Sequence, residues 1–235
     1  MSPFLGEFAG TALLIIIGQG VVSNVVLDKT KGQNSGWIVI GLGWAMAVFV
    51  GVYTATKLGS AGHINAAITI ALAAFGDFDP SLIPAYIGGQ FAGAITGSIV
   101  AWLAYKQHFD ETKNMDAKLA VFCTGPAIRS AGYNLLTEII GTFVLMFGAL
   151  TMTPSTAPFV TLDALPVALL VLGIGLALGG PTGYAINPNR DLGPRIAHFI
   201  LPIKNKRDSD WSYSWIPVVG PTIGALLAAW LFKMI

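Results

Sequence analysis

Charged residues are scarce in this chain of 235 residues. Asp, Glu, Lys and Arg together make up 11% of it, whereas soluble domains carry about 25%, because their surfaces must stay solvated. Hydrophobic residues make up 54% of the chain, and the mean hydropathy is +0.69. So few charges could not cover the surface of a protein that folds in water. The composition therefore predicts a protein of the lipid bilayer.

Cysteine is nearly absent, and neither sign of charge is in excess. The single cysteine, Cys123, falls in a long polar connection, so the sequence predicts neither disulfides nor a cysteine-based metal site. We expect no metal and no other cofactor. The net charge of +1 gives no indication of a nucleic-acid partner. The chain begins without a basic leader, and Glu7 interrupts its first apolar stretch, so we expect this segment to stay in the mature protein.

Long apolar stretches, in contrast, are frequent. A helix that crosses the bilayer needs about 20 mostly apolar residues. Six stretches qualify: Phe4–Leu27, Gly36–Thr56, Leu82–Lys106, Tyr133–Met152, Leu162–Gly180 and Trp211–Lys233. The polar gaps between them predict solvent-exposed loops at Asp28–Ser35, Gln107–Ser130 and Pro202–Asp210. An even number of spans places both termini on the same side of the membrane.

Two further apolar segments, Asn65–Phe75 and Asn187–Ile200, are too short to cross the bilayer. Segments of this length are typical of re-entrant or interfacial helices. Each begins at an asparagine, a residue that favours the N-cap position of helices. We therefore predict two half-helices that enter the membrane without crossing it.

The sequence also repeats itself. The first span contains Glu-Phe-Ala-Gly-Thr from Glu7, and the fourth contains Glu-Ile-Ile-Gly-Thr from Glu138. The predicted half-helices follow the second and the fifth spans, so the halves cover approximately residues 1–110 and 131–235. Because three spans is an odd number, the second half must enter from the opposite side. In such inverted repeats, broken helices at the repeat interface commonly form the solute site.

Two segments carry a resemblance to a known family. Residues 60–69 (SAGHINAAIT) resemble the first signature of the aquaporin and glycerol-facilitator family, the major intrinsic proteins. Residues 183–195 (GYAINPNRDLGPR) resemble the second signature, including the Arg-Asp pair of the glycerol-conducting branch. The resemblance covers the whole chain. It implies an all-α membrane protein with six transmembrane helices and two re-entrant half-helices, a single channel domain over residues 1–235, and a homotetramer in the cell membrane.

Both asparagine motifs depart from the family pattern of Asn-Pro-Ala. The first reads Asn65-Ala66-Ala67, and the second reads Asn187-Pro188-Asn189. Pro188 suits the first helical position, where no N–H is needed, and its loss at Ala66 should loosen that helix start slightly. Asn189 should add polar bulk beside the junction of the half-helices.

The resemblance assigns a selectivity filter to Trp44, Gly175, Tyr184 and Arg190. Trp44 is expected opposite Arg190. Arg190 would donate hydrogen bonds to the hydroxyl groups of the solute and repel cations, while the rings of Trp44 and Tyr184 would contact its CH groups. The hydroxyl of Tyr184, where phenylalanine is usual, would narrow or rewet the filter. The residues themselves leave other roles open: an ion pair of Arg190 with Asp191, and packing or interfacial positions for the two aromatic residues.

The remaining expectations concern the backbone of the pore. The resemblance implies a ladder of backbone carbonyls at Ala61, Gly62, His63, Gly183, Tyr184 and Ala185. His63 is otherwise open as a proton carrier or a metal ligand, but no second His or Cys stands at ligand spacing. Glu7 and Glu138 are expected to brace the half-helix loops, with a proton relay as the alternative. Asp191 is expected to brace the start of the second half-helix.

The sequence thus predicts a passive channel for glycerol and other small neutral solutes, with water, and not an enzyme, because no nucleophile–base pair or metal cluster is present. Two alternatives stay open: a channel for protonated lactic acid or a similar small neutral acid, and a proton-coupled secondary transporter that uses the two glutamates. The resemblance places both termini in the cytoplasm, whereas the basic residues of the loops on the other side predict the reverse orientation.

Overall fold

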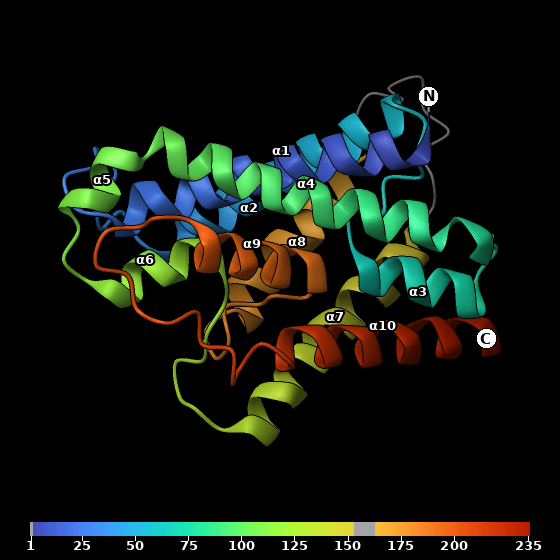
Figure 1. Ribbon diagram of the computed structural model, residues 1–235. Coiled ribbons are helices and arrows are strands. Elements are labelled where there is room, and N and C mark those ends of the chain that lie inside the picture. The colour runs from blue at the N-terminus through green and yellow to red at the C-terminus, as the bar shows by residue number, and fades with distance from the viewer. Residues whose placement is uncertain (1, 153–162) are drawn as a thin grey trace.

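The computed structural model describes residues 2–152 and 163–235, and in this part the chain is a bundle of helices (Figure 1). Five helices are long and apolar enough to cross a membrane: α1 (Pro3–Val26), α2 (Trp37–Lys57), α4 (Ile83–Ala104, preceded by the 3-10 turn Pro80–Leu82), α7 (Ala131–Thr151) and α10 (Ile216–Met234). The fifth predicted span appears as α8 (Leu165–Leu178), which is 14 residues long. The predicted start of that span, Leu162, lies outside the described residues.

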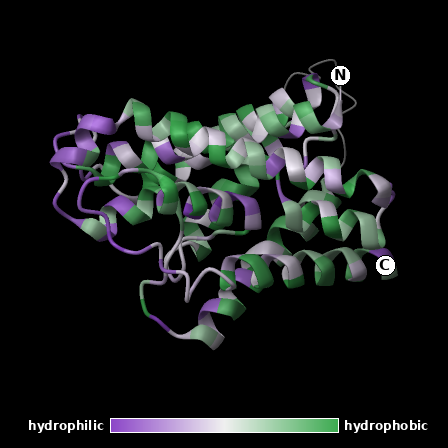
Figure 2. Cartoon of the chain, viewed as in Figure 1, coloured by the Kyte–Doolittle hydropathy of each residue, from purple (hydrophilic) through white to green (hydrophobic). Residues whose placement is uncertain are grey.

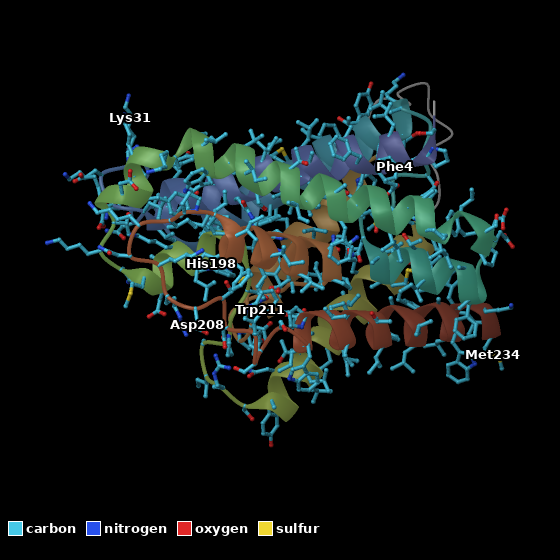
Figure 3. All side chains as sticks on the ribbon, viewed as in Figure 1. Phe4, Lys31, His198, Asp208, Trp211 and Met234 are labelled. Atoms are coloured by element: carbon cyan, nitrogen blue, oxygen red, sulfur yellow. The ribbon has the colours of Figure 1, made fainter. Side chains whose placement is uncertain are left out.

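The two ends of the bundle differ in polarity. Hydrophobic residues dominate the long helices, and hydrophilic residues gather at the end that holds α5 (Figure 2). Both chain termini lie at the opposite end (Figure 1), where Figure 3 places Phe4 and Met234, whereas Lys31 lies at the polar end. The even number of crossings predicted this arrangement. We call these ends the terminal end and the loop end.

The prediction of a simple solvent loop at Gln107–Ser130 is wrong. The segment forms two short helices, α5 (Lys106–Glu111) and α6 (Met115–Phe122), and α6 packs on α1 and on the half-helix α9. Asn114 caps α6 by accepting hydrogen bonds from two backbone N–H groups. Phe109, Phe122 and Cys123 are buried, because this connection folds back over the end of the bundle. The predicted last span also begins too early, since Trp211–Trp215 forms turns before α10.

Both predicted half-helices are present, as α3 (Ala66–Phe75) and α9 (Pro188–Ile200). Their N-caps are Asn65 and Asn187, whose side chains accept hydrogen bonds from backbone N–H groups of the first helical turn. These bonds satisfy donors that a helix beginning inside the membrane would otherwise leave unpaired.

The long helices cross closely because small residues lie at their contacts. A Cβ atom on Gly93 of α4 would lie 2.3 Å from the carbonyl oxygen of Phe8 on α1. A Cβ atom on Gly224 of α10 would lie 2.3 Å from the carbonyl oxygen of Ile139 on α7. The same crossing therefore occurs in each half, with glycine where the backbones touch. Each half-helix packs on a long helix of the other half, α3 on α10 and α9 on α4, so the halves interlock.

Candidate solute pathway and selectivity filter

The two half-helices meet at their N-terminal ends through their asparagine caps. Nδ2 of Asn65 donates to the carbonyl oxygen of Ile186, and Nδ2 of Asn187 donates to that of Ile64, both at 2.8 Å. An amide nitrogen carries two donors, and this bond uses one of them. Both asparagines also line a cavity. The junction therefore combines amide donors with the positive ends of two helices, an environment that disfavours cations.

Three cavities follow one another through the bundle. The central cavity has a volume of about 200 Å³ and contains the asparagine junction. It shares Trp44, Tyr184 and Arg190 with a cavity of about 260 Å³ at the loop end. It shares His63 with a cavity of about 620 Å³ that reaches Lys233 at the terminal end. The shared residues mark two constrictions on one candidate pathway.

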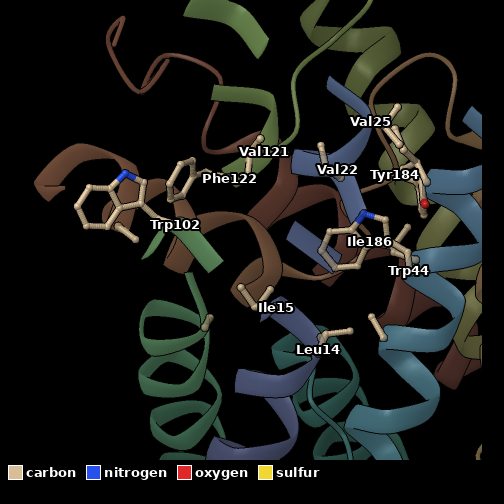
Figure 4. Close-up of a cluster of buried hydrophobic side chains, with 14 of the residues drawn as sticks. Leu14, Ile15, Val22, Val25, Trp44, Trp102, Val121, Phe122, Tyr184 and Ile186 are labelled. Atoms are coloured by element: carbon tan, nitrogen blue, oxygen red, sulfur yellow. The ribbon is translucent and has the colours of Figure 1, made fainter. Parts of the chain in front are cut away.

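The constriction toward the loop end holds the predicted filter residues Trp44, Tyr184 and Arg190, all of them buried. The guanidinium carbon of Arg190 lies 4.0 Å from the centroid of the Trp44 ring, so the two side chains stack. They were expected to face one another, and the structure instead brings them into contact. Gly18 of α1 leaves room for the indole, since a Cβ atom there would lie 2.3 Å from the ring. Figure 4 shows Trp44 beside Tyr184 and Ile186.

Gly175, the fourth predicted filter residue, packs against the ring of Tyr184 and is not among the residues that line the described cavities. A Cβ atom on Gly175 would lie 2.8 Å from Cζ of Tyr184, so the glycine makes space for the phenol ring. Nε1 of Trp37 donates to the carbonyl oxygen of Gly175 at 2.9 Å, and its ring meets that of Tyr184 edge-on with 5.8 Å between centroids. Sequence reasoning missed Trp37. The signal was its spacing, because residues seven apart, such as Trp37 and Trp44, share a helix face.

Glu7 is fully buried and accepts four hydrogen bonds. Oε1 accepts from Oγ of Ser60 at 2.5 Å and from the backbone N–H of His63 at 2.9 Å. Oε2 accepts from the backbone N–H of Ile64 and from Nε2 of Gln90, both at 2.7 Å. Ile64 has a φ of 42°, in the left-handed region that a β-branched residue rarely adopts. The carboxylate thus stabilises a strained loop.

Glu138 occupies the corresponding place in the second half. Oε1 accepts from Oγ1 of Thr182 at 2.7 Å and from the backbone N–H of Ala185 at 3.0 Å, and Oε2 accepts from that of Ile186 at 2.9 Å. Tyr184 and Ile186 have φ values of 41° and 44°. Both glutamates therefore contact the loops that sequence analysis expected them to brace.

Asp191 was expected to brace the start of α9. It lies in the first turn of α9, but its carboxylate accepts hydrogen bonds from the backbone N–H and the hydroxyl of Thr124, both at 2.7 Å. It also forms an ion pair with Arg195 at 2.8 Å, and both side chains are fully buried. Arg195 in turn donates to the carbonyl oxygens of Ser209 and Thr124. Asp191 therefore ties the loops of the loop end to α9, and within the described residues it makes no ion pair with Arg190.

The unusual residues of the asparagine motifs occupy different places. Ala66 and Pro188 are the first residues of α3 and α9. Ala67 is buried against α10. Asn189 is also buried, and its Nδ2 donates to Oε1 of Gln90 on α4 at 2.8 Å. Asn189 does not line any of the described cavities. Sequence reasoning missed Gln90, whose signal was a polar residue inside an apolar span.

The residues of the predicted carbonyl ladder line the three described cavities. Gly62, His63, Tyr184 and Ala185 line the central cavity, Gly183 lines the one at the loop end, and Ala61 lines the one at the terminal end. The N–H groups of His63 and Ala185 point to the two glutamates.

Comparison with known proteins agrees with this geometry. The chain is 58% identical to a probable glycerol uptake facilitator of Thermotoga maritima, over 99% of this chain and 100% of that one. It is 52% identical to the glycerol uptake facilitator of Streptococcus pneumoniae R6, over 100% and 99% of the two chains. The X-ray structure of the aquaglyceroporin of Plasmodium falciparum superposes with a TM-score of 0.87 at 31% identity, covering 99% of this chain and 95% of that one. The family model for the major intrinsic proteins matches residues 1–232. The chain therefore belongs to the major intrinsic protein family, as a multi-pass protein of the cell membrane.

Proposed function

We propose that this protein is a passive channel for glycerol and other small neutral solutes, with water as a further permeant. One observation carries the proposal: at the constriction toward the loop end, Arg190 stacks on Trp44 at 4.0 Å beside the ring of Tyr184. Such a constriction places the hydrogen-bond donors of Arg190 next to the apolar ring surface of Trp44 and Tyr184. Glycerol has a hydroxyl edge and a CH edge, so both faces of the solute find a partner. The names of the two bacterial relatives support the same substrate.

The central cavity continues this division. Leu14, Val48, Leu145 and Val171 contribute apolar side chains from α1, α2, α7 and α8. The two asparagines and the pore loops also line this cavity, and we propose the carbonyl groups of the loops as a ladder of acceptors. A solute that sheds water at the constriction regains hydrogen bonds along this ladder, which lowers the barrier to passage.

Two features oppose the passage of ions. Arg190 is 8% exposed, and its positive charge lies beside the pathway. The N-terminal ends of α3 and α9 add partial positive charges at the asparagine junction. Cations and protons would meet both positive regions on the way through.

The two alternatives make different demands on the same residues. A channel for protonated lactic acid would use this filter unchanged, so flux has to separate the two solutes. A proton relay would need carboxylates that exchange protons with the pathway. Glu7 and Glu138 instead accept four and three hydrogen bonds from donors that belong to the fold. These bonds favour bracing, and we propose a channel with no catalytic step.

Stopped-flow light scattering of proteoliposomes tests the proposal. We expect glycerol and water to cross faster than in protein-free vesicles. Lactic acid should be measured at two pH values, one near its pKa and one well above it. A flux that follows the protonated acid and exceeds the glycerol flux would replace glycerol by lactic acid as the substrate.

We also propose that the channel assembles as a homotetramer. Large hydrophobic side chains such as Ile38, Leu103 and Leu136 are exposed on the long helices, where lipid or another subunit covers them. Native mass spectrometry of the purified protein measures the stoichiometry, and a monomer alone would contradict this proposal.

A further inference from the structure

A buried chain of hydrogen bonds joins the second half-helix to the brace of the first pore loop. Nδ2 of Asn189 on α9 donates to Oε1 of Gln90 on α4 at 2.8 Å. Nε2 of Gln90 donates to Oε2 of Glu7 at 2.7 Å. The same oxygen of Glu7 accepts the backbone N–H of Ile64, a residue that lines the central cavity. The side chains of Asn189, Gln90 and Glu7 are all fully buried.

The direction of these bonds is fixed by Glu7. Oε2 of Glu7 accepts the backbone N–H of Ile64, and Gln90 turns its amide nitrogen toward the same oxygen. Oε1 of Gln90 then faces α9 and needs a donor there, which Asn189 supplies. Since the oxygen and nitrogen of an amide are assigned from their partners, the orientation of both amides follows from the acceptor oxygen of Glu7. Removal of Asn189 would leave Oε1 of Gln90 without this donor, while Nε2 of Gln90 would still donate to Glu7 and, at 3.1 Å, to Oγ1 of Thr69.

The inverted repeat contains a natural comparison. Gly89 and Gly220 occupy the same place, each packed against the brace glutamate of its own half. The next residue is Gln90 in α4 but Pro221 in α10, whose side chain has no hydrogen-bonding group. The second residue of the half-helix is Asn189 in α9 but Ala67 in α3. The link from half-helix to brace is therefore made on one side only.

Packing does not account for Asn189. At the equivalent contact, Ala67 lies in a cluster of small apolar residues with Met146: Ala71, Ala225, Ala228 and Ala229. Asn189 instead buries an amide whose Oδ1 has no hydrogen-bond partner within the described residues. A buried polar atom without a partner destabilises a fold. In the first half, Ala67 makes the equivalent contact without a buried amide. We therefore attribute the amide of Asn189 to its hydrogen bond with Gln90.

We propose that Asn189 is a positioning residue that sets the solute preference of the channel through Gln90 and Glu7. Asn189 holds the outer end of the Gln90 amide, Gln90 donates one of the four hydrogen bonds that hold the carboxylate of Glu7, and Glu7 holds the N–H groups of His63 and Ile64. The link thereby fixes how far the wall of the first pore loop projects into the central cavity. This inference rests on the proposed function, because it concerns the choice between glycerol and water.

Two substitutions test the link. Asn189→Ala removes the donor. Asn189→Asp keeps the shape of the side chain but places an acceptor oxygen opposite Oε1 of Gln90. We expect Asn189→Ala to change the glycerol-to-water permeability ratio about two- to tenfold, the range for loss of one buried hydrogen bond. Asn189→Asp should change the ratio further in the same direction. Both permeabilities are measured in the same vesicles, so a smaller amount of folded channel cancels in the ratio.

A double-mutant cycle locates the effect. If Asn189 acts through Gln90, the variant with both Asn189→Ala and Gln90→Ala has the ratio of Gln90→Ala alone. Ser98 lies on α4, as Gln90 does, and Ser98→Ala is the matched control, because it loses a buried hydrogen bond from Gln19 of α1 without touching Glu7. It should keep the wild-type ratio.

The outcomes are distinct. A wild-type ratio in Asn189→Ala, or additive effects in the cycle, would overturn this inference while glycerol flux in the wild type still supports the proposed function. Absence of glycerol flux in the wild type would overturn the proposed function and this inference with it.

Discussion

The loop before α3 and the loop before α9 are held in the same way, each by a glutamate from a neighbouring long helix. Glu7 takes two backbone N–H groups of the first loop, and Glu138 takes two of the second. The third residue after the capping asparagine is Ile68 in the first half and Arg190 in the second, and both line the central cavity. The repeat thus supplies one scaffold twice, while the cation of the filter comes from one half only.

The largest effect should follow from loss of the shared scaffold. Glu7→Ala and Glu138→Ala each strand two buried backbone N–H groups, at a cost of about 1–3 kcal/mol per group. We expect both to lower the melting temperature strongly and to reduce the yield of folded protein. The glutamine variants should be milder, because an amide oxygen still accepts. Thermal unfolding in detergent measures this, and an unchanged melting temperature in either alanine variant would contradict the bracing role.

The next effect separates the two halves. Arg190→Ala removes the charge beside the pathway, so proton leak into proteoliposomes should rise by about tenfold, as expected if roughly 1.4 kcal/mol of repulsion is lost. Ile68→Ala at the equivalent position of the first half is the control and should leave the leak unchanged. A pH-sensitive dye inside the vesicles reports both. Equal leaks in the two variants would argue against a filter role for Arg190.

A smaller change concerns the contact between Gly175 and Tyr184. In Gly175→Ala the new Cβ would lie 2.8 Å from Cζ of Tyr184, so the ring must move. We expect glycerol permeability to change severalfold relative to water. Gly173→Ala, on the same helix, has open space for its Cβ and should match the wild type. Identical ratios in both variants would show that the phenol ring does not bound the constriction.

The smallest effect should make the halves more alike. Asn65 has φ −155° and ψ 118°, close to the −159° and 111° of Asn187, which precedes a proline. Ala66→Pro therefore meets a backbone already suited to proline, and we expect stabilisation of about 0.4–1 kcal/mol. A small rise in melting temperature would agree. A fall would mean that the start of α3 does not tolerate the ring.

The sequence predicted most of the scaffold for physical reasons. Runs of about 20 apolar residues have few alternatives to a membrane helix, and asparagine at Asn65 and Asn187 marks helix starts that the structure confirms. The first half-helix was predicted to begin within one residue of its observed start.

Contacts between distant segments were less predictable. The burial of Cys123 and the pairing of Asp191 with Thr124 depend on α6 folding back onto α9, which no local pattern indicates. The link from Asn189 to Gln90 crosses 99 residues of sequence. Polar residues in apolar spans could be noticed, but their partners follow from the fold.

The most direct test of the account is glycerol flux into proteoliposomes with and without a proton gradient. A passive pathway of three cavities predicts a rate that rises linearly with the glycerol gradient and stays the same when a protonophore is added. Saturable uptake that collapses with the proton gradient would contradict the account and make the two buried glutamates candidates for proton carriers.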